Sequence, residues 1–310
     1  MIPVLITGSS GLVGSSLIIE LVNEGYKVVG YDKYNSNPHI ENFSFEEGDL
    51  CDFPRLATVV QYHQISIIIH CGGISHPKVG AASPYNIVQT NIVGTVNVFE
   101  AARLFKLKKV INLSSGAVYG KNDLVITKED DKTEPTSIYG VSKLTGEQIA
   151  AVFSSEYGVE IISLRLAFVY GPKRSMPDPI KIFLEKAVRG EDILEKSGAD
   201  QELEFIYIKD AVAAVKKALS LNYTESNVFN IGNGRNHSVK EILAIIGEIF
   251  PDISIEVGPG DQGYDTAGPF DCSRAKDELG FETKYSLEDG IREYAAFLKN
   301  YNSNNKLSIR

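Results

Sequence analysis

The chain has 310 residues, and its composition, 43% hydrophobic and 23% charged, is ordinary for a globular protein. This length predicts one large domain or two, and the apolar content excludes a chain that is disordered throughout. The net charge of −9 at pH 7 argues against a nucleic-acid partner, because such proteins normally carry a basic surplus.

Metal, disulfide and membrane features are also not expected. The three cysteines, Cys51, Cys71 and Cys272, are far apart and odd in number, which favours a reducing compartment. No Cys or His pair has the spacing of a metal site, so we expect no metal. No apolar run approaches the roughly 20 residues of a membrane span, and no basic segment precedes the apolar start. We expect a cytoplasmic protein without a membrane or nucleic-acid partner.

Strands and helices are predicted to alternate in the first half of the chain. Short apolar runs predict strands at residues 2–6, 27–31, 43–46, 65–69, 109–113 and 160–164. Longer amphipathic stretches predict helices at residues 12–24, 85–105 and 137–157. This alternation is typical of βαβ units with a parallel sheet that is buried on both faces. We expect an α/β fold with a Rossmann-type doubly wound parallel sheet over residues 1–165.

The pattern loosens after residue 165. Residues 171–179 hold three prolines and predict a loop. Helices are predicted at about residues 180–189, 210–221, 238–250 and 286–299. Ser238 and Glu241 have the spacing of a capping box, and Asp210 is expected to cap its helix. We expect residues 166–310 to form mainly a smaller α+β substrate lobe, with some segments returning to the first domain and residues 302–310 frayed.

A glycine-rich loop follows the first predicted strand and opens the first helix. Gly8, Gly11 and Gly14 would let the backbone approach a pyrophosphate, and the helix N-terminus would supply free N–H groups. Asp32, 18 residues beyond Gly14, suits a ribose hydroxyl and repels a 2′-phosphate. The loop therefore predicts NAD rather than NADP, although Lys33 lies next to Asp32. The alternative is a structural glycine turn with a solvated aspartate.

Tyr139 and Lys143 lie one helical turn apart on the same face of a predicted helix. An ammonium beside a phenol lowers the pKa of tyrosine from about 10. Such a tyrosine can remove a proton from a substrate hydroxyl while hydride leaves the same carbon. Ser115 ends a predicted strand at the sheet edge where α/β folds bind ligands, and it could donate a hydrogen bond to the reacting oxygen.

These motifs resemble those of extended short-chain dehydrogenases/reductases, of the NAD-dependent epimerase/dehydratase type. The family's order and spacing are matched by TGSSGLVG, Asp32, GDL (48–50), HCGG (70–73), NIVGT, SSGAVYG, YGVSK and LRLAFVYGP. The resemblance spans about residues 1–300 and implies that Ser115, Tyr139 and Lys143 are catalytic. It also implies NAD contacts at Gly8, Ser10, Gly11, Leu12, Val13, Gly14, Asp32, Asp49, Leu50, Cys71, Gly72, Gly73, Asn91, Tyr139 and Lys143. A homodimer through the helices at 85–105 and 137–157 is a further implication, whereas His70 and Cys71 are expected to be strand-end residues without a chemical role.

The chain departs from the family at positions that hold a nucleotide diphosphate. The family's epimerases have Asn where this chain has Phe168, Arg where it has Leu203, and Arg before the Gly-Asp pair that here follows Gly258 and Pro259. Each lost charged hydrogen bond removes about 1.5–3 kcal/mol of binding energy. The dehydratase branch fits less well, because Gly116 and Ala117 replace its Asp-Glu pair. These departures argue against a nucleotide-sugar substrate.

Another branch, the sugar-acid dehydrogenases, resembles the chain at HCGGIS (70–75) and SSGAV. That resemblance implies substrate contacts at Ser75, Ser115, Gly116, Phe168 and Arg174, with Arg174 binding a carboxylate as a bidentate partner. The alternatives are that Ser75 caps a loop and that Lys173 and Arg174 are a solvated pair. We therefore expect an NAD-dependent dehydrogenase of a non-nucleotide sugar or sugar acid. A UDP-glucose type 4-epimerase is the main alternative, and a non-catalytic NAD sensor is a third.

Overall fold

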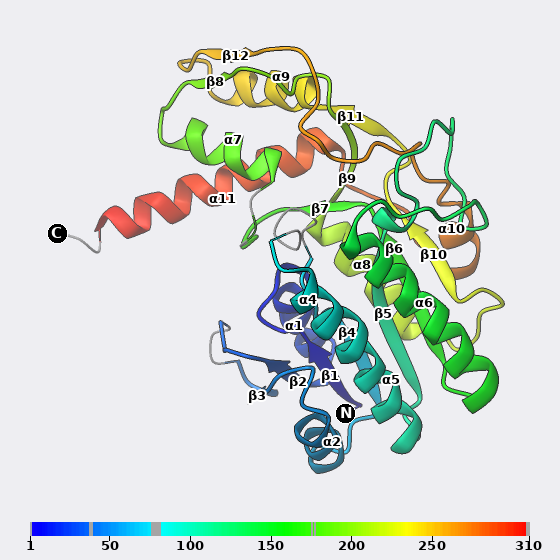
Figure 1. Cartoon of the computed structure of the whole chain (residues 1–310). Coiled ribbons are helices and arrows are strands. Elements are labelled where there is room, and N and C mark those ends of the chain that lie inside the picture. The colour runs from blue at the N-terminus through cyan, green and yellow to red at the C-terminus, as the bar shows by residue number, and fades with distance from the viewer. Residues whose placement is uncertain (1, 37–39, 76–81, 175, 177, 308–310) are drawn as a thin grey trace.

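The computed structural model describes residues 2–36, 40–75, 82–174, 176 and 178–307, with the backbone alone for 302–307 (Figure 1). Within these residues a sheet of seven parallel strands has the order β10-β6-β5-β4-β1-β2-β3. Its strands are β1 (Pro3–Thr7), β2 (Lys27–Asp32), β3 (Phe43–Glu47), β4 (Ile67–His70), β5 (Lys109–Ser115), β6 (Ile161–Leu166) and β10 (Val228–Ile231). The order runs outward in both directions from β1 and β4, which places a topological switch point between them. The doubly wound parallel sheet expected from the sequence is confirmed.

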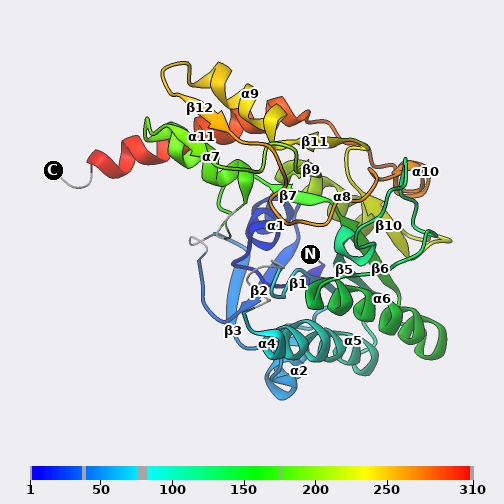
Figure 2. The same cartoon turned by 45° about the horizontal axis from the view of Figure 1, so that its top comes forward.

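Helices cover both faces of this sheet (Figure 2). One face carries α1 (Leu12–Asn23) and α8 (Ile208–Ser220), and the other carries α2 (Phe53–Tyr62), α5 (Gly94–Leu104) and α6 (Ile138–Tyr157). Successive residues of β1 point to opposite faces, so that Leu5 is buried in one hydrophobic cluster and Ile6 in the other. This two-sided burial explains the continuous apolar runs of the strands.

The helix expected at 85–105 is continuous but not uniform. It consists of α4 (Pro84–Ile87), a π-helical turn (Val88–Val93) and α5. The sequence interpretation also missed α2, whose first turn is capped by the Asp52 side chain accepting the backbone N–H of Arg55. A further short helix, α10 (Ser273–Leu279), was missed as well.

The second half of the chain contributes to both parts of the molecule. It adds β10 and α8 to the large sheet, and it builds two small sheets with three helices above it (Figure 1). The small sheets are β11-β9-β7 and β12-β8, from β7 (Phe168–Tyr170), β8 (Ile193–Glu195), β9 (Glu202–Tyr207), β11 (Asn236–Ser238) and β12 (Ile255–Val257). The helices of this upper part are α7 (Pro179–Val188), α9 (Val239–Ile249) and α11 (Leu287–Leu307).

Two local expectations for this half are wrong, and one is confirmed. Asp210 does not cap α8, which begins at Ile208; its carboxylate instead accepts the backbone N–H groups of Lys284 and Tyr285, each at 3.0 Å. The backbone of residues 302–307 continues α11 rather than fraying, and 308–310 lie outside the described residues. The capping box of Ser238 and Glu241 is present at the start of α9. None of the helices described is long and apolar enough to cross a membrane.

Candidate active site

A cavity of about 1070 Å³ lies along the carboxyl ends of the large sheet. It continues from the glycine-rich loop after β1, past the end of β5, to residues 263–270 of the upper part. Most of the site residues expected from the sequence line it, namely Gly8, Gly11, Leu12, Val13, Gly14, Asp32, Asp49, Leu50, Cys71, Gly72, Gly73, Ser75, Ser115, Gly116, Tyr139, Lys143, Phe168 and Arg174. Ser10 and Asn91 were also expected to contact the cofactor, but they do not line the cavity.

The glycine-rich loop is packed too tightly to hold side chains. A Cβ on Gly14 would lie 2.3 Å from the Gly8 carbonyl oxygen, and one on Gly8, at φ +67°, would lie 2.6 Å from the Gly72 Cα. Helix α1 begins just after Gly11, with no side chain capping its N-terminus and no acidic residue in its first turn. This uncapped N-terminus fits a pyrophosphate, because its N–H groups and dipole favour an anion.

The Asp32 carboxylate is held at the end of β2, and its neighbours explain two of the sequence expectations. Its Oδ2 accepts the Ser10 backbone N–H at 2.9 Å, and its Oδ1 accepts that of Lys33 at 2.7 Å. Ser10 therefore orients Asp32 instead of lining the cavity. The Lys33 ammonium forms an ion pair with Asp49 at 2.8 Å. Lys33 is therefore bound to a second carboxylate that lines the cavity beside Asp32. A ribose hydroxyl fits this arrangement, and the Asp32 charge disfavours a 2′-phosphate.

Asn91 acts through the loop after β4. It lies in the π-helical turn and is buried; its Oδ1 accepts the Ile74 N–H at 2.7 Å, and its Nδ2 donates to the Ile74 carbonyl at 3.1 Å. The same amide donates to the Ser142 hydroxyl at 3.1 Å. Asn91 thus ties the loop that contains Gly73 and Ser75 to helix α6, and it does not contact the cavity itself.

The three expected catalytic residues come together where β5 and α6 meet the cavity. Helix α6 begins with a cap, in which the Ser137 hydroxyl accepts the Gly140 N–H. Lys143 lies one turn after Tyr139, with its Nζ 5.9 Å from the centre of the Tyr139 ring and 2.8 Å from the Leu113 carbonyl oxygen, to which it donates. A hydrogen bond joins the side chains of Ser115 and Tyr139.

The electrostatics of this group differ from the expectation in one respect. Burial raises the pKa of Tyr139 above its usual value, and Ser115 and Arg174, rather than Lys143, act to lower it. Burial also lowers the pKa of Lys143 to about 8, while the charge of Glu147 acts to raise it. Both side chains are shielded from water, so the neutral form of each gains relative to its charged form.

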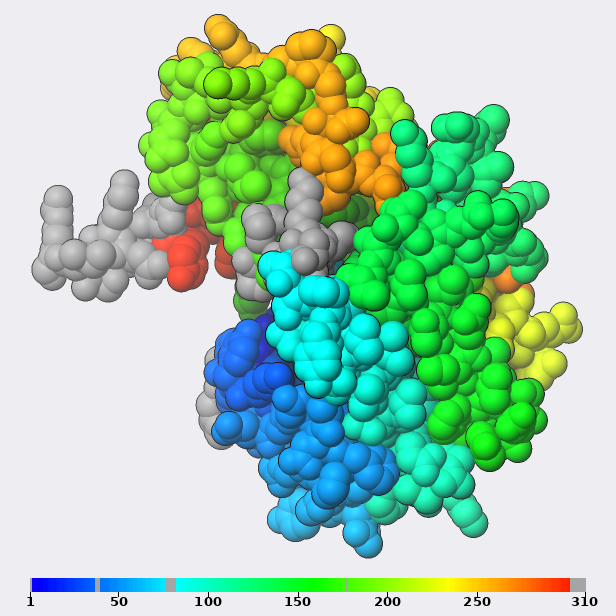
Figure 3. Space-filling view, in the orientation of Figure 1, coloured from blue at the N-terminus to red at the C-terminus, as the bar shows by residue number. Residues whose placement is uncertain are grey.

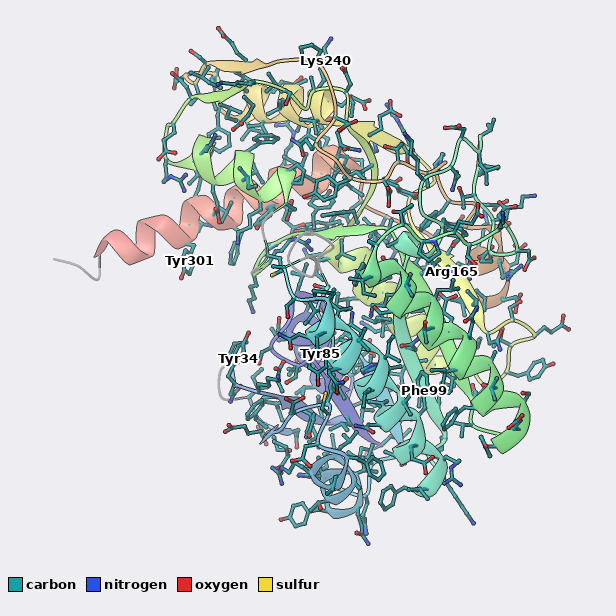
Figure 4. All side chains as sticks on the ribbon, in the orientation of Figure 1. Tyr34, Tyr85, Phe99, Arg165, Lys240 and Tyr301 are labelled. Carbon is teal, nitrogen blue, oxygen red and sulfur yellow. The ribbon has the colours of Figure 1, made fainter. Side chains whose placement is uncertain are left out.

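A buried ion pair of Glu147 with Arg165, the latter labelled in Figure 4, lies behind this group and was missed in the sequence analysis. Glu147, one further turn along α6, accepts hydrogen bonds from Arg165 Nε at 3.0 Å and Nη2 at 2.7 Å, and from the Ser114 hydroxyl. Both members of the ion pair are nearly fully buried. The spacing of Tyr139, Lys143 and Glu147 in steps of four is the signal that could have revealed it.

The substrate half of the cavity is built around Arg174. Its Nε lies 2.6 Å from Asp178 Oδ2, its Nη1 donates to the Val169 carbonyl at 2.7 Å, and its guanidinium carbon lies 5.0 Å from the centre of the Phe168 ring. The side chain is only 11% exposed, so it is not a solvated surface cation. Lys173 is exposed and does not line the cavity.

Three further cavity residues, Glu204, Tyr264 and Phe270, were not singled out from the sequence as site residues. The buried Glu204 carboxylate accepts the backbone N–H groups of Gly234 and Phe270, each at 2.7 Å. Burial raises the pKa of Glu204 to about 7. No group of three or more His, Cys, Asp or Glu in the described part of the chain is arranged to hold a metal ion.

Comparison with known proteins identifies the family. The NAD dependent epimerase/dehydratase family matches residues 4–232, which is most of the chain. The chain belongs to this family. Membership agrees with the resemblance drawn from the sequence motifs, and it confirms NAD as the cofactor and an enzyme of this class.

Individual members of the family match along nearly their whole length. The UDP-glucose 4-epimerase of Mycolicibacterium smegmatis is 28% identical, over 96% of this chain and 98% of its own. The crystal structure of the Thermotoga maritima UDP-glucose 4-epimerase with UDP-glucose superposes with a TM-score of 0.88 at 28% identity, over 97% and 100% of the two chains. The UDP-glucuronic acid 4-epimerase of Bacillus cereus, in complex with UDP-glucuronic acid and NAD, gives 0.85 at 26% identity, over 97% and 100%.

Proposed function

We propose that this enzyme is a nucleotide-sugar 4-epimerase that acts on a UDP-hexose. The observation that carries the proposal is the full-length likeness to 4-epimerases, including one bound to UDP-glucose. The cavity supports it, because one continuous space runs from the glycine-rich loop, which suits the cofactor, to Phe168 and Arg174, where a substrate would lie beside it. This reading takes what was the alternative at the sequence level as the main function.

The geometry of Arg174 also favours the epimerase over the sugar-acid dehydrogenase. A bidentate bond to a substrate carboxylate uses two N–H groups that lie side by side on one edge of the guanidinium. In Arg174 the Nε faces Asp178 and an N–H of Nη1 is bound to the Val169 carbonyl. The edge of the guanidinium that carries Nε therefore faces a carboxylate of the protein itself, so that edge is not available for a bidentate bond to a substrate carboxylate.

The residues of the chain have distinct roles in this proposal. NAD, held at this site, would supply the hydride acceptor for oxidation of the sugar C4 and the hydride donor for its reduction from the opposite face. Tyr139 would remove the proton of the C4 hydroxyl and later give it back, and Ser115 would donate a hydrogen bond to the same oxygen. Lys143 would hold the nicotinamide ribose. The α1 N-terminus would bind the pyrophosphate and Asp32 the adenosine ribose.

A dehydrogenase of a free sugar or sugar acid is the second candidate. Phe168 and Leu203 both line the cavity, at positions where the family's nucleotide-sugar epimerases have polar or charged side chains. An apolar wall there gives no charged hydrogen bond to a diphosphate. A substrate without a diphosphate loses no contact at this wall, which is the observation that favours the second candidate.

We also propose that the chain forms a homodimer through α5 and α6, and that residues 166–310 supply most of the substrate lobe. Large apolar side chains are exposed around these two helices, at Val93, Leu104, Val141, Val152 and Tyr157. Exposed apolar side chains on two neighbouring helices suit an interface, because a partner subunit would remove them from water. Light scattering of the purified protein tests this part of the proposal.

The test of function uses purified protein, NAD and a panel of UDP-hexoses, free sugars and sugar acids, with NADH followed by absorbance and products by NMR. A 4-epimer of a UDP-hexose formed without net NADH supports the epimerase. Stoichiometric NADH from a free sugar or sugar acid overturns it in favour of the dehydrogenase. Tyr139→Phe tests whether the protein only binds NAD without catalysing a reaction. If it is an enzyme, this variant should still bind NAD and should lose turnover.

A further inference from the structure

An irregular segment, residues 262–270, covers the substrate half of the cavity. We name it the roof segment. Its cavity-lining residues are Gly263, Tyr264, Asp265, Ala267, Gly268 and Phe270. In Figure 3 the orange surface that includes these residues lies between the green upper part and the loop to its right. Because the segment belongs to no helix and no sheet ladder, its shape depends on the groups that bind its backbone.

Residues of the loop after β5, in the first half of the chain, bind one side of the roof segment. Asn122 Oδ1 accepts the Gly268 N–H at 3.0 Å, and its backbone N–H donates to the Thr266 carbonyl at 3.2 Å. Thr127 donates its backbone N–H to the Pro269 carbonyl at 2.7 Å. These contacts fix the later part of the segment, from Thr266 onward.

The earlier part is held by Gln201, a side chain that is only 1% exposed and directly precedes β9. Its Oε1 accepts the backbone N–H groups of Gln262 and Tyr264, each at 3.1 Å. Its Nε2 lies within hydrogen-bond distance of the Thr266 hydroxyl at 3.1 Å, the Glu202 carbonyl at 3.2 Å and the Tyr264 carbonyl at 3.3 Å, so its two N–H groups are shared among three acceptors. Tyr264 is therefore bound by one amide through both its N–H and its C=O.

The position of Tyr264 links this clamp to the substrate site. Its ring meets the Phe168 ring edge-on with centroids 6.0 Å apart, and Phe168 in turn lies under the Arg174 guanidinium. All three side chains line the cavity. A shift of the roof segment at Tyr264 would therefore change the wall that a substrate meets.

We propose that Gln201 is a positioning residue of the substrate site, which holds the roof segment so that Tyr264 forms the cavity wall beside Phe168 and contacts the bound sugar nucleotide. Only a primary amide can accept from two N–H groups with its oxygen and donate to two oxygens with its nitrogen at one place. Glutamate keeps the acceptor and loses the donors, and methionine of similar length loses both. The proposal rests on the proposed function for the identity of its ligand.

The test compares Gln201→Met with the wild type and with Gln61→Met, which makes the same chemical change at an exposed position of α2. Hydrogen exchange without substrate measures the clamp itself, and we expect the Tyr264 amide to lose protection in Gln201→Met alone. With UDP-glucose, we expect KM to rise by about tenfold, as for the loss of one good contact. We expect kcat to stay within about threefold and NAD affinity to be unchanged, because uniform substrate binding is what is lost.

The outcomes separate this inference from the proposed function. The inference is overturned if Gln201→Met has the hydrogen exchange of the wild type at Tyr264 and the KM of the wild type, whether or not its thermal stability falls. A wild type that neither binds nor converts UDP-glucose, together with lost protection in Gln201→Met, overturns the proposed function and supports the clamp. If Gln201→Met does not fold, Gln201→Glu serves instead, and the clamp predicts a smaller loss of protection and a smaller rise in KM.

Discussion

Arg174 and Asp178 form an ion pair beside the substrate half of the cavity, with Arg174 Nε 2.6 Å from a carboxylate that is fully buried. The other Asp178 oxygen accepts the Lys181 N–H at the start of α7. Asp178 therefore fixes both the start of a helix and the direction of the guanidinium that lies over Phe168. The loop before α7, which the sequence marks only as proline-rich, is thereby joined to the site.

Replacing Asp178 by Asn should destabilise the protein by about 3 kcal/mol, because it leaves a largely buried guanidinium without its charge partner. Asn keeps the helix cap, so the loss reports mainly on the ion pair. Urea unfolding of Asp178→Asn, Arg174→Met and the double variant measures the coupling between the two side chains. A loss of stability in the double variant equal to the sum of the losses in the two single variants would show that the two residues do not act as a pair.

Removing the hydroxyl of Tyr139 should lower kcat by about 10²–10⁴, the usual contribution of a positioned acid or base. NAD affinity should stay as in the wild type, because the glycine-rich loop and Asp32 are untouched. Turnover of Tyr139→Phe is compared with that of Tyr62→Phe, the same change at an exposed position of α2. Full activity in Tyr139→Phe would remove this residue from the reaction.

The rate should depend on the charge of Lys143. The pKa of Lys143 is lowered to about 8 by burial, so its ammonium is present below that pH and is lost as the pH rises through it. We expect kcat/KM, which reports ionisations of the free enzyme, to fall across this range. Glu147→Gln should move the fall to lower pH, because the Glu147 charge acts to raise the pKa of Lys143. A pH–rate profile in which the two proteins lose activity at the same pH would contradict this coupling.

Most of the large sheet could be predicted from the sequence, because its strands are buried on both faces and leave uninterrupted apolar runs. The upper part could not, since β7, β8, β11 and β12 have three residues each, too few to show a period. Helix α2 was missed for a related reason. It has ten residues with a proline at its start, and the local pattern does not separate it from a loop.

The site divides in the same way. The cofactor half is local in sequence, since a glycine-rich loop, a strand-end aspartate and a Tyr-Lys pair each carry their chemistry within a few residues. The substrate half depends on contacts between distant positions, such as Gln201 with Tyr264 and Glu204 with Phe270, over 60 residues apart along the chain. The periodicity of the sequence does not predict contacts between residues so far apart along the chain. A substrate contact of Arg174 was expected from the sequence, but the ion pair of Arg174 with Asp178 could be identified only in the structure.

Acid should destabilise the protein partly through His70. This side chain is buried between the hydroxyls of Thr7 and Thr95, and burial lowers its pKa to about 3. As the pH falls below about 6.5, the unfolded state takes up a proton that the folded state does not, so the unfolding free energy falls by up to about 1.4 kcal/mol per pH unit. His70→Gln should lack this component, and urea unfolding of both proteins between about pH 4.5 and 7 measures the difference. Parallel pH dependences would show that His70 is not responsible.

The close approach of Gly116 and Phe270 gives a test of how the roof segment packs against the turn that follows β5. A Cβ on Gly116 would lie 2.5 Å from Phe270 Cζ, and the Phe270 side chain is buried against Tyr119 with its backbone N–H bound to Glu204. Gly116→Ala should therefore cost about 1–3 kcal/mol of stability, as overpacking does, and should raise the substrate KM by displacing the roof segment. Gly116→Ala combined with Phe270→Leu should recover part of both losses, because the smaller side chain makes room for the added methyl group. Unfolding and steady-state kinetics of the two single variants and the double variant test this, and a double variant as impaired as the sum of its parts would place the strain elsewhere.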